Sequence, residues 1–292
     1  MTRPVAVTIA EVIANAARRL AAQGIENARL DAEVLLGHVL GRDRAWLVAH
    51  FSDTLDDDSR GPYDRAVGRR IRREPLQYIT GMQEFWGLEF TVSRDVLIPR
   101  PETELVVEAA LGQAADIASP VIIDLCTGSG CIAVSLARGL PLARCFATDR
   151  SATALAVAGK NAALNGVADQ IRFLEGDLFG PLDELDLRGG VDIVTANPPY
   201  VRDGERAGLQ AEVRDFEPAL ALFAGPLGTE VAERIIAGTP EFLKPGGRLF
   251  MEMGIGQAAA LEKSIEETGQ YRSPHILKDL ADIERVIVAE KK

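Results

Sequence analysis

The stretch VIIDLCTGSGCIAVSLA, residues 121–137, decides the fold. It opens with a short apolar run, passes through the turn CTGSG at residues 126–130, and continues as an apolar segment. A short apolar run before a glycine turn predicts a buried strand, and the segment after the turn predicts a helix over 131–138. Gly128 and Gly130 suit the turn, because glycine reaches positive φ and lets the backbone approach a ligand closely.

The same alternation of strand and helix continues to the end of the chain. Further strands are predicted at 143–149, 171–177, 191–197, 272–278 and 284–290, and a turn followed by a strand within 243–254. Further helices are predicted at 151–165, 229–243 and 257–268. Strands that alternate with helices are typical of an α/β fold, with a mostly parallel sheet covered on both faces. The last two strands follow each other directly, which predicts one antiparallel member.

The N-terminal part predicts a small helical bundle. Thr8 and Glu11 form a capping-box pattern ahead of apolar residues at helical spacing, and Gly24 is placed to end that helix. A second apolar stripe at 30–40 and a polar segment at 56–73 predict two more helices.

A connector is predicted between the bundle and the α/β part. Glu74-Pro75 ends the last bundle helix, because proline lacks an amide hydrogen and restricts the residue before it. The segment 76–93 is rich in aromatic and β-branched residues and predicts a β-hairpin. IPRPETE, residues 98–104, leads into a helix at about 102–115. The expected organisation is a helical bundle at 1–73, a β-hairpin connector at 74–98 and an α/β domain at 99–292.

The composition indicates a soluble globular protein. The chain has 292 residues, of which 47% are hydrophobic and 26% charged, and its formal net charge is −11. This charge weighs against an enzyme that wraps nucleic acid, which usually carries a basic footprint. No apolar run approaches the roughly 20 residues that span a bilayer, and no signal pattern opens the chain. We expect a cytoplasmic monomer without membrane or direct nucleic-acid contact.

The cysteines and histidines predict neither a disulfide framework nor a metal site. The three cysteines form no C-x-x-C pair and the three histidines lie far apart in sequence: Cys126, Cys131, Cys145, His38, His50 and His275. An odd number of unpaired cysteines fits a reduced, intracellular chain.

The turn after the first α/β strand and the acid after the second are candidates for a ligand site. Together with Ala133, the turn matches the pattern G-x-G-x-x-A. By itself this pattern fits either a dinucleotide-binding site or a tight turn that binds no ligand. Ligands of open α/β sheets bind at the carboxyl ends of the strands. Asp149 ends the second strand, where a carboxylate can accept hydrogen bonds from ribose hydroxyls. Its alternative role is to cap the helix that starts near Ser151.

Three further residues bear on the ligand. Asp177 ends the third strand, where it either accepts from an adenine amino group or caps the next element, and Leu178 can pack against the ring. Asp124 ends the first strand and suits a sulfonium or ammonium cation. A dinucleotide needs a helix N-terminus to hold its pyrophosphate, whereas S-adenosylmethionine carries none. The acids therefore favour the methyl donor over NAD.

Asn197, Pro198, Pro199 and Tyr200 follow the fourth strand and indicate the reacting group. A planar amine or amide nitrogen is a poor nucleophile because its lone pair is delocalised. The side-chain carbonyl of Asn197 and the main-chain carbonyl of Pro198 can accept its hydrogens, so that the lone pair points at a methyl carbon. The prolines fix φ and preorganise these acceptors, and Tyr200 can pack against the planar group. The alternative is a proline-rich turn without chemistry.

The C-terminal part resembles a class I methyltransferase, and N-P-P-Y is shared by such enzymes that act on planar nitrogens. Together, four segments resemble the bacterial release-factor glutamine methyltransferases, the PrmC/HemK family: REPLQYITGMQEFWGLEFTVSRDVLIPRPETE, DLCTGSGCIAVSLA, EVRDFEPALALFAGPLG and KDLADIERVIV. The similarity runs from about residue 72 to the end. IPRPETE favours the release-factor branch over the ribosomal-protein glutamine methyltransferases.

The resemblance implies a Rossmann-like, seven-stranded methyltransferase domain that uses S-adenosylmethionine and leaves S-adenosylhomocysteine. It implies N5-methylation of the glutamine in the Gly-Gly-Gln loop of class I peptide chain release factors. The motifs and the resemblance together assign the following residues to the cofactor site: Asp124, Cys126, Thr127, Gly128, Ser129, Gly130, Asp149, Asp177, Leu178 and Asn197. They assign to the site of the substrate glutamine the residues Asn197, Pro198, Pro199 and Tyr200.

Other segments have implied roles too. Pro99 to Glu104 would close over the donor, and the bundle and hairpin would help to dock the substrate. Two positions depart from the family pattern: Cys126 stands where glycine is usual, and Leu227 and Thr229 replace the usual loop sequence.

Three alternatives remain at this point. An N6-adenine methyltransferase of DNA or RNA would use the same two acceptors, at Asn197 and Pro198, to hold the amino group of a flipped base. Such an enzyme should carry a basic face. The only candidate for that face is a cluster formed by Arg69, Arg70, Arg72 and Arg73. A non-catalytic binding module would leave the clamp and the glycine turn unused. An NAD-dependent oxidoreductase would leave N-P-P-Y unexplained and lacks an evident proton donor.

Overall fold

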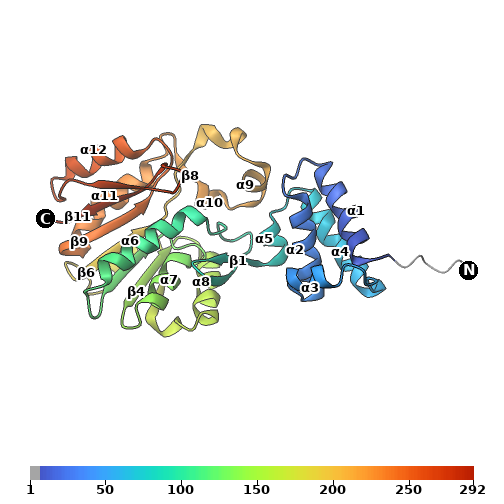
Figure 1. The fold of residues 1–292 in the computed structure, drawn as a ribbon. Helices are drawn as coiled ribbons and strands as arrows, with labels where there is room; N and C mark the ends of the chain where they lie inside the picture. The colour runs from blue at the N-terminus through green and yellow to red at the C-terminus, as the bar shows by residue number, and fades with distance from the viewer. Residues whose placement is uncertain (1–6) are drawn as a thin grey trace, which may run out of the picture. The chain divides into compact units, whose positions relative to one another are not determined.

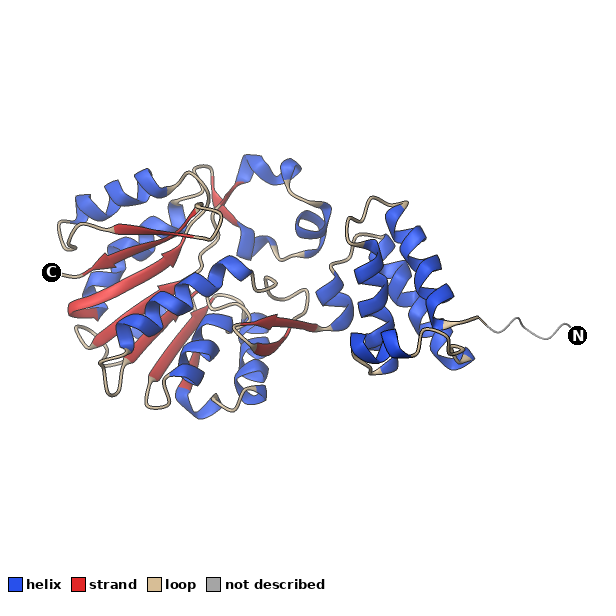
Figure 2. Cartoon of the chain, in the orientation of Figure 1, coloured by secondary structure: helices blue, strands red, loops and turns tan. Residues whose placement is uncertain are grey.

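The computed structural model describes residues 7–292, which divide into two units (Figures 1 and 2). One unit consists of the helices before residue 82 together with Ala211–Phe216, and the other contains Met82–Gln210 and Glu217–Lys292. No helix in the described part of the chain is long and apolar enough to cross a membrane.

The first unit is a helical bundle, as its sequence predicts. Its helices are α1 (Ile9–Ala21), α2 (Ala28–Leu40), α3 (Arg44–Ala49), α4 (Asp57–Ile71), α5 (Leu76–Thr80) and, from later in the chain, α9 (Ala211–Phe216). The predicted capping box is present: the Glu11 amide donates to Thr8 Oγ1, and Glu11 Oε2 accepts from the Thr8 amide at 2.8 Å. Ile13, Leu20 and Val67 are fully buried in the bundle core.

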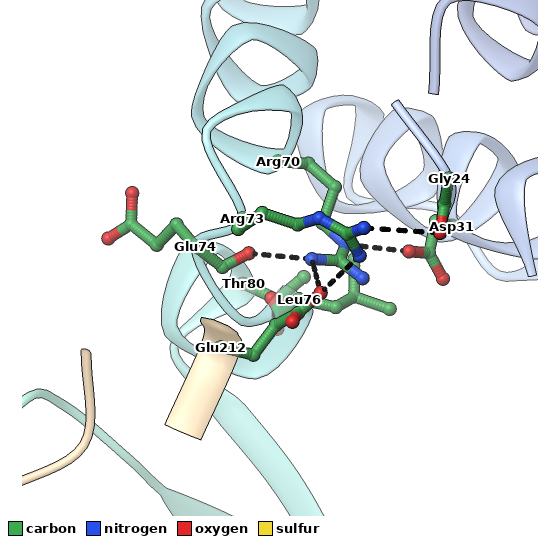
Figure 3. A network of polar contacts seen from close by, with 8 residues as sticks. All are labelled: Gly24, Asp31, Arg70, Arg73, Glu74, Leu76, Thr80 and Glu212. Carbon is green, nitrogen blue, oxygen red and sulfur yellow. Dashed lines mark hydrogen bonds and ion pairs between the residues drawn. The ribbon is translucent and has the colours of Figure 1, made fainter. Parts of the chain in front are cut away.

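Charged side chains join α9 to the bundle (Figure 3). The Arg70 guanidinium donates to Asp31 at 2.7 Å and to Glu212 at 3.0 Å, and Arg73 donates to the same Glu212 oxygen at 3.0 Å. Arg70 and Asp31 are both buried. Because breaking a buried ion pair leaves an uncompensated charge, this network holds residues 211–216 with helices that precede them by over a hundred positions.

The predicted hairpin over residues 76–93 is wrong in its first part. Residues 76–80 form the helix α5, and the hairpin comprises only β1 (Met82–Phe85) and β2 (Leu88–Thr91). Tyr78 and Ile79 are buried in the helical unit, and this burial outweighs their local preference for a strand. Gly81, at φ 78°, ends the helix in the left-handed region.

The second unit is built on a seven-stranded sheet in the order β10-β11-β9-β6-β3-β4-β5. The strands are β3 (Val121–Leu125), β4 (Arg144–Asp149), β5 (Ile171–Glu175), β6 (Val191–Ala196), β9 (Leu243–Glu252), β10 (His275–Lys278) and β11 (Glu284–Glu290). Only β11 runs antiparallel to its neighbours, which confirms the predicted single antiparallel member.

Helices cover both faces of this sheet (Figure 2). They are α6 (Glu104–Ala114), α7 (Cys131–Gly139), α8 (Ala152–Leu164), α11 (Glu230–Phe242) and α12 (Ala258–Thr268). Successive strand residues point to opposite faces, so Ile122 packs in a core with α6, α7 and α8, and Ile123 in a core with α11 and α12. This double burial explains why the strands read as continuous apolar runs.

The segment between β6 and α11 contains short elements. They are β7 (Val201–Arg202), the 3₁₀ helix η4 (Asp203–Gly208), α9, α10 (Ala219–Leu222) and β8 (Phe223–Gly225). Other 3₁₀ helices are η1 (Pro101–Thr103), η2 (Ala168–Gln170) and η3 (Gly180–Leu182).

The strand order brings two sequence motifs together. β3 pairs in parallel with β6, with Leu125 opposite Ala196. The glycine turn at 126–130 and the N-P-P-Y segment at 197–200 therefore leave the sheet side by side at its carboxyl edge, where open α/β sheets bind ligands.

Asn161 fastens the hairpin to this edge. It is fully buried in α8; its Oδ1 accepts from the Thr91 amide at 2.7 Å, and its Nδ2 donates to the carbonyls of Thr91 (3.0 Å) and Ser129 (2.9 Å). One amide thereby satisfies three backbone groups of β2 and the glycine turn.

We predict that Asn161→Ala lowers the free energy of unfolding by about 2–4 kcal/mol, because it leaves those backbone groups without partners in a buried place. Urea denaturation followed by circular dichroism measures the change. Asn165→Ala, which removes a hydrogen bond to the Glu89 carbonyl at a more exposed position, is the control and should cost under about 1 kcal/mol. Equal losses in both variants would contradict the role of Asn161.

Candidate functional site

A cavity opens at the carboxyl edge of the sheet, entirely within the α/β unit. Among the predicted site residues, those that line it are Cys126, Thr127, Gly128, Ser129, Asp149, Asp177, Leu178, Asn197 and Pro199. Asp124, Gly130, Pro198 and Tyr200 are not among the lining residues. Arg100 and Thr103 also line it, and both belong to the segment 99–104 that the resemblance implies closes over the donor. Arg234 lines it as well, and the sequence analysis did not single this residue out.

The glycine turn takes three residues into the left-handed region: Cys126 at φ 57°, Gly128 at φ 55° and Gly130 at φ 79°. A Cβ on Gly130 would lie 3.0 Å from the Ala158 Cβ, so Gly130 serves the packing of the turn against α8. Cys126 adopts its conformation at a steric cost that glycine would not carry. Burial raises the pKa of its thiol, which keeps the sulfur neutral.

Asp149 holds the turn and faces the cavity. Its Oδ2 accepts from the Gly128 amide and its Oδ1 from the Ser151 amide, each at 2.9 Å. The cap of α8 is Ser151 itself, whose Oγ accepts from the Ala154 amide at 3.1 Å. Each carboxylate oxygen keeps a second lone pair for a ligand. Burial raises the pKa of Asp149.

Asp124 lies behind the cavity wall and is 1% exposed. Its Oδ2 accepts from the Thr127 hydroxyl at 2.6 Å and its Oδ1 from the Thr195 hydroxyl at 2.7 Å. Burial raises its pKa to about 6, against the lowering effect of the two hydroxyls. The direct contacts of Asp124 are therefore with the turn and with β6.

Asp177 and Leu178 both line the cavity after β5. Leu178 takes the left-handed conformation at φ 50°, and its side chain is buried. Asp177 Oδ2 accepts from Arg234 Nη2 at 2.6 Å, which brings a cation from α11 to the cavity. Arg234 lies far away in sequence and has no local pattern that would reveal it.

The N-P-P-Y segment places Asn197 at the cavity wall. Its Nδ2 donates to Thr103 Oγ1 at 3.1 Å, while its Oδ1 accepts no hydrogen bond from the part of the chain that the structure describes. Tyr200 does not line the cavity; burial raises its pKa, and the negative charge of Glu252 adds to that rise. Gln257 Nε2 donates to the Tyr200 carbonyl at 3.0 Å and steadies the end of the segment.

Glu252 is a buried acid that the sequence analysis missed. It ends β9, is 3% exposed, and its Oε2 accepts from Thr103 Oγ1 at 2.6 Å. Burial raises its pKa to about 7, while hydrogen bonds from Thr103 and Tyr200 and the charge of Arg285 act to lower it. An acid inside the apolar run LFMEM was the signal that could have revealed it.

A second acid ties the IPRPETE segment to the loop before α10. Glu217 is buried, and its Oε1 accepts from Arg100 Nη2 at 2.6 Å. Burial raises the pKa of Glu217, and the Arg100 charge opposes that rise. Arg100 lines the cavity, so this ion pair fixes part of its rim.

The sheet order, the glycine turn, the acid after the next strand and the N-P-P-Y segment together define a class I methyltransferase. Two family models match: PrmC N-terminal domain over residues 11–81 and Methyltransferase small domain over residues 103–217. The catalytic domain of hMettl16 has a similar fold, with a TM-score of 0.56 at 18% identity over 85% of this chain and 92% of that one.

Curated relatives narrow the class to one family. A release factor glutamine methyltransferase of Moorella thermoacetica is 42% identical, covering 98% of this chain and 99% of its own. Its counterpart in Geobacter sulfurreducens is 40% identical, covering 98% and 97%. The chain belongs to the release factor glutamine methyltransferase family, which is S-adenosylmethionine-dependent. The adenine-methyltransferase alternative is not favoured.

We predict that part of the folding stability is lost as pH rises from about 4 to about 7. Asp124 and Glu252 have raised pKa values in the fold, about 6 and about 7, so the native state binds more protons than the unfolded chain in that window. Their contribution is therefore full below the unfolded pKa values of about 4 and is lost through the folded ones.

Urea denaturation at pH 5 and pH 8 tests this sign. The Glu252→Gln variant, which cannot titrate at this position, should lose less stability between the two pH values than the wild type does. Parallel losses in both proteins would contradict the raised pKa of Glu252.

Proposed function

We propose that this protein transfers a methyl group from S-adenosylmethionine to the side-chain amide nitrogen, N5, of the glutamine in the Gly-Gly-Gln loop of class I peptide chain release factors. The observation that carries the proposal is the Asn197 amide at the cavity wall. Its nitrogen is held by Thr103, and its oxygen is left to accept a hydrogen bond. An acceptor in that place suits a substrate that presents N–H groups, as a glutamine amide does.

The cavity residues fit the donor better than a dinucleotide. The Gly128 amide, which would face a pyrophosphate in a dinucleotide site, already donates to Asp149. Asp149 is suited to the ribose hydroxyls, and Asp177 and Leu178 to the adenine. Asp124 supports the turn from behind through Thr127. When bound, S-adenosylmethionine supplies an electrophilic methyl group.

The chain's own residues make the amide reactive by orienting it. Asn197 Oδ1 and the Pro198 carbonyl accept the two N–H groups, so the nitrogen lone pair faces the donor. The prolines fix the backbone and so limit the reorganisation needed at the moment of reaction. The new N–C bond forms as the S–C bond breaks, and the nitrogen releases one proton to solvent.

The helical unit helps to dock the release factor, and residues 99–104 close over the donor. The protein acts as a cytoplasmic monomer without direct contact to nucleic acid or membrane. The net charge of −11 supports the absence of a nucleic-acid footprint.

Methyl transfer to a purified class I release factor tests the proposal. Labelled S-adenosylmethionine should mark the native factor and leave unmarked a factor that carries alanine in place of the loop glutamine. Asn197→Ala should lower the rate by at least about 100-fold, because it removes an acceptor aimed at the reacting amide. Label on the alanine factor, or none on the native factor despite measurable cofactor binding, would overturn the assignment.

Asp149 is predicted to govern affinity for the donor. Asp149→Ala should raise the dissociation constant for S-adenosylmethionine about 10- to 100-fold, because charged hydrogen bonds contribute about 1.5–3 kcal/mol each. Isothermal titration calorimetry measures the change, with the exposed Asp169→Ala as control. Unchanged affinity in the Asp149 variant would exclude the ribose role.

A further inference from the structure

Both ends of the N-P-P-Y segment converge on one carboxylate. β9 lies beside β6, with Met251 opposite Ala196, so Glu252 stands next to the point where the segment leaves the sheet. The Glu252 carboxylate accepts from the Thr103 hydroxyl at 2.6 Å, and Thr103 Oγ1 accepts from Asn197 Nδ2 at 3.1 Å. The Tyr200 side chain lies near enough to the same carboxylate to lower its pKa.

The chemistry of these groups gives the chain of hydrogen bonds a direction. An ionised carboxylate only accepts, so the single hydroxyl hydrogen of Thr103 is committed to Glu252. The Thr103 oxygen is then left with lone pairs alone and requires a donor from Asn197. Only the amide nitrogen of Asn197 can donate, so its carbonyl oxygen turns to the cavity.

We propose that Glu252 and Thr103 are positioning residues that fix the orientation of the Asn197 amide, with the carbonyl oxygen presented to the substrate. This inference rests on the proposed function for the identity of the substrate amide. A reversed Asn197 would present its own N–H groups to the N–H groups of a glutamine, and two donors repel each other. The direction of one hydroxyl thereby determines whether the clamp can hold its substrate.

Other charged groups around Glu252 leave this arrangement intact. Glu102 precedes Thr103 and disfavours the ionised form of Glu252, whereas Arg285 on β11 favours it. Arg285 itself is shared, because its Nη2 lies 3.5 Å from Glu102 and its Nε donates to Asp279 at 2.8 Å. Glu252 therefore has partial cationic support, and the Thr103 hydroxyl donates a hydrogen bond to it.

The direct test observes the Asn197 side chain. In protein labelled with ¹⁵N-asparagine, the NH₂ signals of Asn197 are identified by their absence in Asn197→Asp. We expect these protons to exchange slowly in the wild type and in Thr103→Ser, which keeps the hydroxyl, and faster in Thr103→Val, which lacks it. Equal exchange in all three proteins would overturn the inference.

Rates of methyl transfer supply the second arm. Thr103→Val should lower kcat about 10- to 100-fold with little change in the dissociation constant of S-adenosylmethionine, whereas Thr103→Ser should stay within about threefold of the wild type. Thr239→Val is the matched control, because it removes an equally buried hydroxyl, which donates to the Ile235 carbonyl away from the cavity, and it should leave kcat unchanged. A Thr103→Val enzyme as fast as Thr103→Ser would contradict the inference.

The pH profile separates orientation from mere packing. Since Glu252 must be ionised to direct Thr103, kcat should rise with pH through about 7 in the wild type, and this limb should be absent in Glu252→Gln. Persistence of the limb in the variant would contradict the role of Glu252. A wild type that leaves the release factor unmethylated, yet shows the expected exchange pattern, would refute the proposed substrate and retain the positioning role.

Discussion

The buried carboxylate of Asp124 joins the two halves of the site. One oxygen accepts from Thr127 in the glycine turn, and the other accepts from Thr195, two residues before Asn197. A buried carboxylate is costly unless its oxygens are hydrogen-bonded, so the two hydroxyls and the acid require one another. Asp124, which does not line the cavity, thus ties the glycine turn to the strand that leads into the N-P-P-Y segment.

Glu252 is the corresponding buried acid on β9, which pairs with β6 on the side opposite β3. It accepts from Thr103 of the IPRPETE segment, and Thr103 in turn accepts from Asn197 of the N-P-P-Y segment. Neighbouring strands β3, β6 and β9 therefore support the cavity from behind with one acid on each side of β6. Such support matters because an acceptor orients an amide only when its own geometry is fixed.

Local patterns made most of the fold predictable. The apolar runs, the glycine turn and the capping box at Thr8 each depend on neighbours in sequence, and the strands and helices follow them closely. Tyr78 and Ile79 read as strand residues but form a helix, because their burial is a tertiary effect. The hydrogen bond between Thr103 and Glu252 joins residues 149 positions apart and leaves no periodic signal. The sequence therefore indicated the N-P-P-Y segment but not the Thr103 and Glu252 side chains that support it.

We expect this site to select a glutamine amide over other planar nitrogens, such as the amino group of adenine. One reaction that offers a class I release factor together with adenine-containing DNA and RNA, followed by tandem mass spectrometry of all three, tests it most directly. We predict a single added methyl group, located on the side-chain nitrogen of the loop glutamine, and unmodified nucleic acids. A methyl group on adenine, or on another residue of the factor, would contradict it.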